Sequence, residues 1–349
     1  YAQDEDSAIL EEIIVKGYRS SLQIALKAKR EATGVVDSIM AEDIADFPDS
    51  NLAEALARIP GVAISRSNGE GRNITVRGLD AKFTRVTIND TMAQSITAGQ
   101  SNRSFDFNIF ASELFNRVDI HKSTDAKMEE GSLGATIALH TGRPFDYDPL
   151  TVAANVQMSY NDLAEESKPR ASGLLSWTND DSTFGALVSV AYSERYIGDV
   201  GPQTGRWEND VFASCTACGG DAALEAQGYD AYHPRFPRYI DGEHDQERTG
   251  ITASLQFQPR DTTLITVDAL FAMIDQKTDS PALTPISLAR TGSTGVQETD
   301  VAAFTLENST LISATMDGMD VRAENFVGLS DSDFEQIAVR LEQDFADRA

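Results

Sequence analysis

Apolar and polar residues alternate along the second half of this chain, and the alternation restricts the fold more than any other feature. The alternating segments are about ten residues long and lie at residues 151–160, 183–193, 249–258 and 263–273. Strict alternation indicates β-strands with one apolar and one polar face. Segments of this length are typical of transmembrane β-barrel strands, although a soluble β-sandwich shows similar alternation in shorter strands. The pattern alone leaves both architectures open.

The connections between these segments differ in length, as a barrel requires. Residues 161–168 and 178–182 are short or moderate, whereas residues 197–246 form a long connection rich in Gly, Asp and aromatic residues. Residues 282–300 are expected to form another long loop. Bacterial barrels have short turns on the periplasmic side and long loops outside the cell, so a barrel accounts for this difference.

Residues 43–85 precede the alternating half and have a different character. A short helix is predicted from apolar residues at helical spacing, which are Leu52, Leu56 and Ile59. Asn51 and Glu54 form a capping-box pattern at its start. Two short strands are predicted at residues 62–65 and 73–77, with a Gly-rich turn between them. The stretch is therefore a helix–strand–turn–strand unit.

The order of motifs in this unit resembles the plug domain of TonB-dependent outer-membrane receptors. The motifs are Ala-Glu-Ala-Leu-Ala-Arg-Ile-Pro-Gly-Val at 53–62 and Ile-Thr-Val-Arg-Gly-Leu at 74–79. The resemblance covers roughly residues 12–146, and the opening of this range is similar to the Caulobacter-type branch, which is associated with oligosaccharide uptake. It implies a mixed α/β plug domain at residues 20–146 inside an antiparallel transmembrane β-barrel.

The barrel implied by the resemblance does not close within this chain. Family barrels have about 22 strands around a plugged lumen. Residues 147–349 have room for roughly six to eight strands, so we expect the chain to hold the plug and only the first part of the barrel, with long extracellular loops.

The resemblance also implies a contact segment for the periplasmic protein TonB. Residues 1–19 are predicted to be a mobile N-terminus that carries the TonB box at Glu12, Ile13, Ile14 and Val15. Such a segment adds as a strand to its partner, so that backbone hydrogen bonds provide affinity. The alternative is an ordinary first strand of the domain.

The resemblance implies active transport across the Gram-negative outer membrane, with an oligosaccharide as the expected substrate. Alternatives are a ferric siderophore or haem taken up by the same mechanism, and a non-transporting barrel or adhesin. Expected partners are TonB, outer-membrane lipid, the substrate, and an outer-membrane lipoprotein or neighbouring receptor. No enzymatic activity, catalytic residue, cofactor or metal is expected.

Charge is distributed unevenly along the chain. Its net charge is −26; residues 1–145 contribute −5 (16 basic, 21 acidic) and residues 146–349 contribute −21 (13 basic, 34 acidic). Nucleic acid is therefore not an expected partner, because phosphate binding needs a basic surface. An acidic mouth also favours a neutral or cationic oligosaccharide over an anionic iron complex. No signal-peptide pattern opens the chain, so a processed N-terminus is expected for an exported protein.

Three sets of residues are candidates for function. We expect plug arginines to pair with an acidic barrel wall, and these are Arg58, Arg66, Arg72, Arg77 and Arg85. We expect substrate contacts from polar plug-loop residues and from loop aromatics that either stack on sugars or pack within the loop, and these are Gln94, Ser95, Arg103, Trp207, Tyr232 and Tyr239. For Cys215 and Cys218 a local disulfide is favoured over a metal site, because no second Cys-x-x-Cys pair is present.

Overall fold

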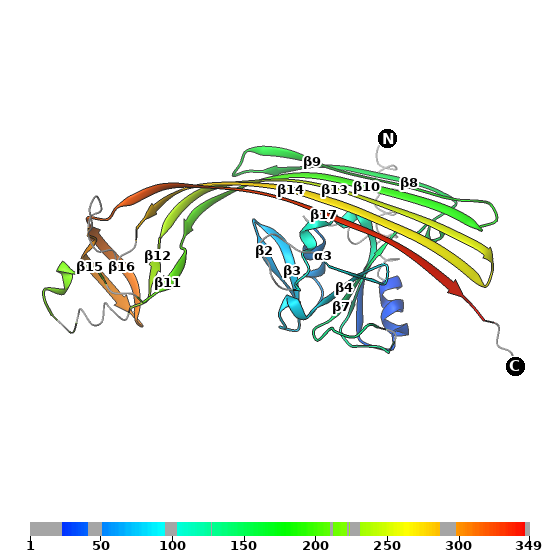
Figure 1. The fold of residues 1–349 in the computed structure, drawn as a ribbon, viewed down its shortest axis with the longest axis horizontal. Coiled ribbons are helices and arrows are strands. Elements are labelled where there is room, and N and C mark those ends of the chain that lie inside the picture. The colour runs from blue at the N-terminus through cyan, green and yellow to red at the C-terminus, as the bar shows by residue number, and fades with distance from the viewer. Residues whose placement is uncertain are drawn as a thin grey trace, which may run out of the picture.

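A small mixed domain lies in the concavity of a large arched sheet (Figure 1). The structure is a computed structural model that describes residues 23–40, 51–94, 103–126, 128–209, 212–221, 223, 231–286 and 298–345. We call residues 23–146 the inner domain and the large sheet, which begins at Leu150, the wall. No helix among the described residues is long and apolar enough to cross a membrane.

The inner domain contains a five-stranded sheet, a separate hairpin and short helices. The sheet has the order β1-β6-β7-β4-β5, and only the β4–β7 pair is parallel. Its strands are β1 (Val36–Met40), β4 (Arg85–Ile88), β5 (Thr91–Ala93), β6 (Phe115–His121) and β7 (Thr136–Thr141). The hairpin consists of β2 (Val62–Ser67) and β3 (Glu70–Val76). The short helices are residues 23–31, α3 (Leu52–Leu56), η1 (Ala81–Phe83), η2 (Phe107–Ile109), η3 (Ser112–Leu114) and η4 (Pro144–Asp146).

The predicted helix is present as α3, and its apolar stripe faces the core. Leu52, Leu56 and Ile59 are all buried, as predicted. Asn51 caps the helix by accepting a hydrogen bond from the Glu54 amide at 3.2 Å. The second half of the predicted capping box is replaced, because the Glu54 carboxylate binds Arg66 instead of the helix start.

One hydrophobic core extends across the inner domain and into the wall. Its inner part is rich in phenylalanine, and the Phe110 ring meets Phe334 of the wall edge-on at a centroid distance of 5.0 Å. Leu270, Ala272 and Ile274 of the wall belong to the same cluster. Each large apolar side chain that is fully buried contributes about 1.5–3 kcal/mol, so the wall stabilises the position of the inner domain.

The wall is a six-stranded antiparallel meander. Its strands are β8 (Leu150–Asn161), β9 (Glu166–Thr178), β10 (Phe184–Gln203), β13 (Arg238–Arg260), β14 (Thr263–Pro285) and β17 (Val321–Gln343). At the end nearer the C-terminus the connections are short, namely 179–183 and 261–262. At the opposite end long connections, 204–237 and 286–320, join β10 to β13 and β14 to β17. The predicted asymmetry of turns and loops is present, except that a short turn, 162–165, joins β8 to β9 at the loop end.

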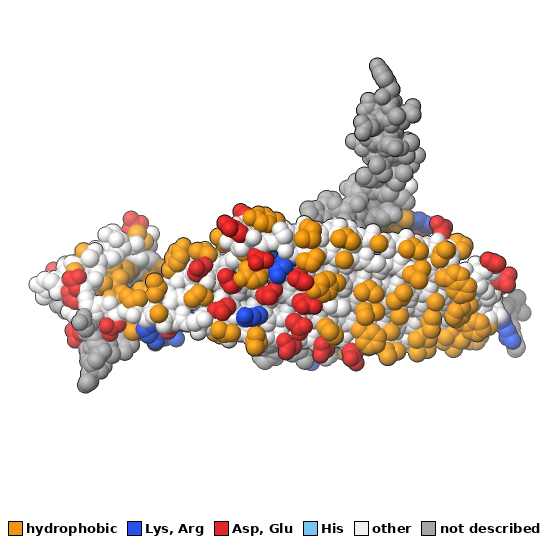
Figure 2. Space-filling view, turned by 90° about the horizontal axis from the view of Figure 1, so that it is seen from above, with side chains coloured by type: hydrophobic (Ala, Val, Ile, Leu, Met, Phe, Trp, Pro, Cys, Tyr) orange, Lys and Arg blue, Asp and Glu red, His pale blue; other side chains and the backbone are white. Residues whose placement is uncertain are grey.

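The predicted alternation sets the two faces of the wall. On β13, Arg248, Thr252 and Ser254 are buried on the concave face, whereas Ile251 and Leu255 are exposed on the convex face. Hydrophobic side chains gather over the half of the convex face nearer the short turns (Figure 2). A strand of 23 residues is about 75 Å long at ~3.3 Å per residue, far more than the apolar band of about 25 Å that a barrel presents to lipid. The strands therefore continue well beyond the predicted ten-residue segments.

A row of four carboxylates crosses the convex face beside the apolar half. Glu194 pairs with Glu247, Glu247 with Asp275, and Asp275 with Asp331, on four neighbouring strands. Acidic side chains are accordingly prominent over the middle of this face (Figure 2). We call these four residues the carboxylate row.

The two long connections fold against each other. They contain the hairpins β11 (Arg206–Glu208) with β12 (His233–Arg235), and β15 (Asp300–Glu307) with β16 (Thr310–Asp317), and the 3-10 turn η5 (Thr216–Cys218). The Val301 amide donates to Ser214 O at 3.0 Å, and the Leu311 amide donates to Tyr232 O at 2.9 Å. Phe212 and Val301 are buried between them. The loops thus form one packed unit at the far end of the wall.

Candidate substrate site above the inner domain

A polar hollow of about 680 Å³ lies on the concave face of the wall, beyond the tip of the β2–β3 hairpin. Alternation along the long strands directs its lining side chains inward. Its lining residues are Asn68, Asp199, Gln203, Arg238, Ile240, His244, Ser280, Ala282, Glu324, Asn325 and Phe326. Amide, hydroxyl, carboxylate and guanidinium groups dominate the lining. The hollow is therefore suited to a polar ligand that makes many hydrogen bonds.

Beside the hollow, the inner domain is fastened to the wall through Glu70. The Glu70 carboxylate accepts from Arg248 at 3.0 and 3.1 Å and from Gln246 at 3.0 Å, and Arg195 lies 3.3 Å away. The side chains of Glu70 and Arg248 are only 1 % and 3 % exposed. Arg248 also donates to Asn108 at 2.6 Å. Since Glu70 is two residues from Asn68, the lining of the hollow and this cluster share the same tight turn.

Further contacts follow the same rule, in which the wall supplies the cation. Arg170 of β9 binds the Glu113 carboxylate of the inner domain, and Arg340 of β17 binds Asp90. Arg143, at the end of the inner domain, is the exception, because it donates to Asp268 of β14 at 3.0 Å. The contact between the two parts is thus mainly wall arginine to inner-domain carboxylate.

The predicted pairing of plug arginines with the wall is wrong for the arginines whose partners the structure defines. Arg66 binds Glu54 at 2.7 Å and Arg72 binds Asp106 at 2.7 Å. Arg77 donates to Lys122 O at 2.7 Å, and Arg85 lies 2.8 Å from Glu129. All of these partners belong to the inner domain. Arg58 is exposed after α3.

The physical reason is the location of the acidic residues. The net charge of residues 146–349 led us to expect them on the face of the wall that contacts the inner domain. Much of this negative charge lies on the convex face, as in the carboxylate row, and faces away from the inner domain. The concave face instead presents Arg170, Arg195 and Arg248. The alternation along a strand could have predicted this, because residues an odd number apart lie on opposite faces. Arg248 lies three residues before the exposed, convex-face Ile251 and therefore lies on the concave face.

None of the described residues predicted to contact substrate lines the hollow. Tyr239 alternates with Arg238 and Ile240, so it lies on the convex face and is exposed. Trp207 and Tyr232 are exposed on the loop unit, and Gln94 and Arg103 are exposed on the inner domain. Ser95 lies outside the described residues. The lining residues were missed because they lie on strand extensions where both faces are polar.

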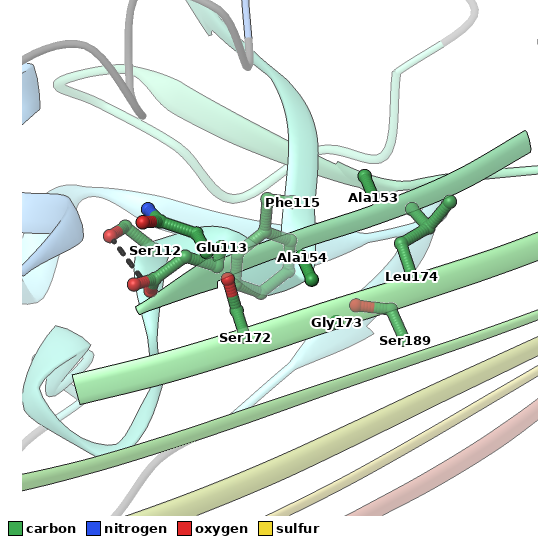
Figure 3. A pocket seen from close by; sticks show the side chains of 10 residues that line it. Ser112, Glu113, Phe115, Ala153, Ala154, Ser172, Gly173, Leu174 and Ser189 are labelled. Carbon is green, nitrogen blue, oxygen red and sulfur yellow. Dashed lines mark hydrogen bonds between the residues drawn. The ribbon is translucent and has the colours of Figure 1, made fainter. Parts of the chain in front are cut away.

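A second, smaller hollow of about 200 Å³ separates the inner domain from β8 and β9. Figure 3 shows Glu113 and Phe115 on one side and small wall residues such as Ala153, Ser172 and Gly173 on the other. Ser112 donates to Glu113 at 3.2 Å, and Glu113 is also bound to Arg170. Its one charged group is therefore already paired, so this space is a packing gap between the two parts.

Two remaining predictions concern the loops and the N-terminus. Cys215 and Cys218 are joined by a disulfide within the loop unit. Among the described residues, no group of His, Cys, Asp and Glu side chains is arranged to hold a metal ion. The proposed TonB box at residues 12–15 lies outside the described residues.

Residues 28–136 match the family model of the TonB-dependent receptor plug domain. Among solved structures, the siderophore receptor PirA from Acinetobacter baumannii is similar at 13 % identity and a TM-score of 0.49, with 74 % of this chain and 38 % of that chain covered. A mutant of the ferric enterobactin receptor PfeA from Pseudomonas aeruginosa, in complex with enterobactin, gives 14 % identity, a TM-score of 0.49, and coverage of 73 % and 39 %.

The Serratia marcescens hemophore receptor HasR, with its hemophore and heme, gives 17 % identity, a TM-score of 0.39, and coverage of 73 % and 38 %. A search of curated protein sequences finds no match. The chain spans about two fifths of the length of these receptor structures. It combines the matched domain with an antiparallel sheet whose outer face is apolar over one half. Residues 28–136 of the inner domain therefore belong to the family of TonB-dependent receptor plug domains, and the antiparallel wall follows them in the chain.

Proposed function

We propose that this protein is part of an active transporter of the Gram-negative outer membrane, driven through TonB. The observation that carries the proposal is a plug domain seated on the polar, concave face of a wall whose convex face has an apolar half. An apolar exterior suits lipid, and a polar interior filled by a plug suits a closed but releasable channel. Outer-membrane lipid is then the surrounding solvent of the wall.

The hollow is the substrate site in this proposal. A substrate that enters between the loop unit and the plug meets Asn68 at the tip of the β2–β3 hairpin. Glu70 lies two residues further on and is held by Arg248 and Arg195. Binding at Asn68 can thus shift the turn between β2 and β3 and weaken the contacts of Glu70 with Arg248 and Arg195. Residues 12–15 then pair with TonB by strand addition. Force applied by TonB to this segment breaks the contacts that hold the plug to the wall.

The substrate we propose is an oligosaccharide. The lining offers amides and hydroxyls from Asn68, Gln203 and Ser280, and the Phe326 ring is exposed beside them. Such groups bind sugar hydroxyls, and an aromatic ring packs against a sugar face. A ferric siderophore or haem is the second candidate, taken up by the same mechanism. An outer-membrane lipoprotein or neighbouring receptor remains a proposed partner.

An uptake experiment tests this proposal. The intact receptor is expressed in cells with and without TonB, and labelled oligosaccharides, ferric siderophores and haem are supplied in parallel. We expect uptake of one class that needs both TonB and the proton gradient. Uptake that continues without TonB, or a receptor found outside the outer membrane, contradicts the transporter. TonB-dependent uptake of an iron complex alone replaces the oligosaccharide by the second candidate.

A further inference from the structure

Arg238 has an unusual environment at the rim of the hollow. It is the first residue of β13 and lines the hollow together with Gln203, to which it is paired across the sheet. Its Nε and Nη2 both donate to the same oxygen, Gln203 Oε1, at 2.9 and 2.5 Å. Gln203 is neutral, and no described carboxylate lies within ion-pair distance of Arg238. The guanidinium charge is therefore oriented but not compensated.

The other arginines around the rim differ in this respect. Arg206 and Arg235 lie 3.1 and 3.3 Å from Glu208, and Arg322 lies 2.8 Å from Glu324. Each thus has a carboxylate within reach, although Arg206 and Arg235 share one. Arg238 alone among these four combines a place in the hollow with a neutral partner.

A second cation lies on the same face near Arg238. Strand β14 lies between β13 and β17, and it fixes the register of the two arginines. Tyr239, next to Arg238, pairs with Leu283 of β14, and Arg322 pairs with Thr284, the following residue of β14. Arg238 and Arg322 are therefore close in register on either side of β14. Two strand spacings separate them by about 10 Å. Arg322 and Arg235 also pack on the Phe236 ring, at 5.4 and 4.7 Å from its centroid. Their charges are therefore held in place at the rim.

Neither lining carboxylate forms an ion pair with Arg238. Glu324 is already bound by Arg322 and by Thr284, the latter at 2.8 Å. Asp199 is the other carboxylate of the lining. The remaining acidic excess of the wall includes the carboxylate row, which is on the convex face. The summed charge of the second half therefore does not describe the hollow, where Glu324 is already paired and Arg238 lies beside Asp199 in the lining.

We infer that the hollow binds an anionic oxygen group of the substrate through the Arg238 guanidinium. Arginine offers a rigid fork of donors that matches a carboxylate or another pair of anionic oxygens, and Gln203 holds one edge of that fork in position. The inference rests on the proposed function and specifies its substrate class. An acidic oligosaccharide and a ferric catecholate both present this chemistry.

Binding to the purified intact receptor tests the inference. The probes are trigalacturonate, the neutral trisaccharide of galactose, and a ferric tris-catecholate complex. We expect at least one anionic probe to bind tenfold or more tightly than the neutral trisaccharide. Arg238→Gln should weaken that probe at least tenfold, and Arg238→Lys, which keeps the charge without the fork, should give an intermediate loss. Which anionic probe binds identifies the source of the anion.

Arg206→Gln is the matched control, because Arg206 lies at the same rim but outside the lining and is paired with Glu208. It should leave all affinities unchanged. Equal affinity for neutral and anionic probes, no binding of either anionic probe, or an unchanged affinity in Arg238→Gln overturns the inference. The assay contains no TonB, so its failure is distinct from a failure of TonB-dependent uptake.

Discussion

Glu70 shows how one side chain fixes the plug. It is enclosed with Arg248 and contacted by Arg195 and Gln246, all from the wall. Breaking such a buried pair by removing one partner typically costs about 3–5 kcal/mol, because the other charge is left without compensation. The stability of the β2–β3 hairpin should therefore depend on Glu70.

We predict that Glu70→Gln lowers the opening free energy of the β2–β3 hairpin by about 3 kcal/mol or more. Hydrogen exchange of the hairpin amides in the intact receptor measures it. Glu54→Gln is the control, since Glu54 pairs with the largely exposed Arg66 and should cost no more than about 1 kcal/mol. Equal effects of the two substitutions contradict a special role for Glu70.

At this scale the sequence predicted core residues better than polar partners. The helical stripe of Leu52, Leu56 and Ile59 is confirmed because periodicity depends only on local geometry. Pairing depends on which face of a distant strand is near. Arg66 and Glu54, for example, meet only because the β2–β3 hairpin folds beside α3. The net charge of a segment does not show which residues become neighbours in the folded chain.

Among the elements, the C-terminal part of β10, residues 199–203, limits the space available to a substrate. Gly201 lies on the concave side between Asp199 and Gln203, and a Cβ added there meets no atom within 4 Å. A large side chain at this position should therefore extend into the hollow without disturbing the sheet. The neighbouring Val200 faces the convex side and is partly exposed.

Gly201→Trp should weaken substrate binding at least tenfold, or about 1.4 kcal/mol, while the folded receptor stays intact. Isothermal calorimetry with the transported substrate measures the affinity, and the heat-modifiability of the barrel on gels reports folding. Val200→Trp adds the same bulk to the other face and should bind normally. Undiminished binding by Gly201→Trp places the substrate elsewhere.

Strand β1 lies at an edge of the plug sheet and is attached through β6. Ser38 donates to Asp119 of β6 at 2.5 Å, and Asp119 is buried. Burial raises the pKa of the Asp119 carboxyl, but hydrogen bonds from His140, Arg117 and Ser38 outweigh it and hold this pKa well below its usual range. The resulting stabilisation is present above the pKa of an unfolded aspartate, about 3.9, and is lost as the pH falls below it.

We therefore predict that β1 loses protection as the pH is lowered from 5 to about 3, across the unfolded pKa of aspartate. In Asp119→Asn, protection of β1 should be lower at pH 5 and should change less over this range. Protection factors for residues 36–40, corrected for the intrinsic exchange rate, report it. The same acid dependence in wild type and variant means that another carboxyl is responsible.

Strands were predictable where one face is apolar and not where both are polar. Ile251 to Phe257 on β13 lie in an alternating segment and were identified. Residues 238–246 of the same strand contain three acidic residues and one histidine and were assigned to a loop. Their strand structure comes from cross-strand hydrogen bonds to β10 and β14. The packing of Phe212 on Val301 likewise joins distant residues.

For the whole molecule, transport requires a link between the plug and an energy source. The proposed TonB box precedes β1 in the chain, and among the described strands β1 pairs with β6 alone. A pull on the N-terminal segment would thus reach the helix at residues 23–31 and then the β1 edge of the plug sheet. Substrate binding in the hollow does not need this link.

Ile14→Pro should abolish uptake and leave substrate affinity unchanged, because proline lacks the N–H that strand addition needs. Gln3→Pro, outside the proposed box, is the control and should transport normally. Uptake assays in cells and binding to purified receptor separate the two effects. Normal uptake by Ile14→Pro means that residues 12–15 do not contact TonB.

The carboxylate row also limits how far the wall can move relative to the lipid. In the proposed setting, the row lies just outside the hydrocarbon, since the apolar half of the convex face adjoins it. Any inward slide carries Glu194, Glu247, Asp275 and Asp331 towards the hydrocarbon together, at a cost that rises with depth. In the proposed transporter, TonB would pull in that direction. The row would then act as a mechanical stop, so that the force displaces the plug while the wall stays at a fixed depth.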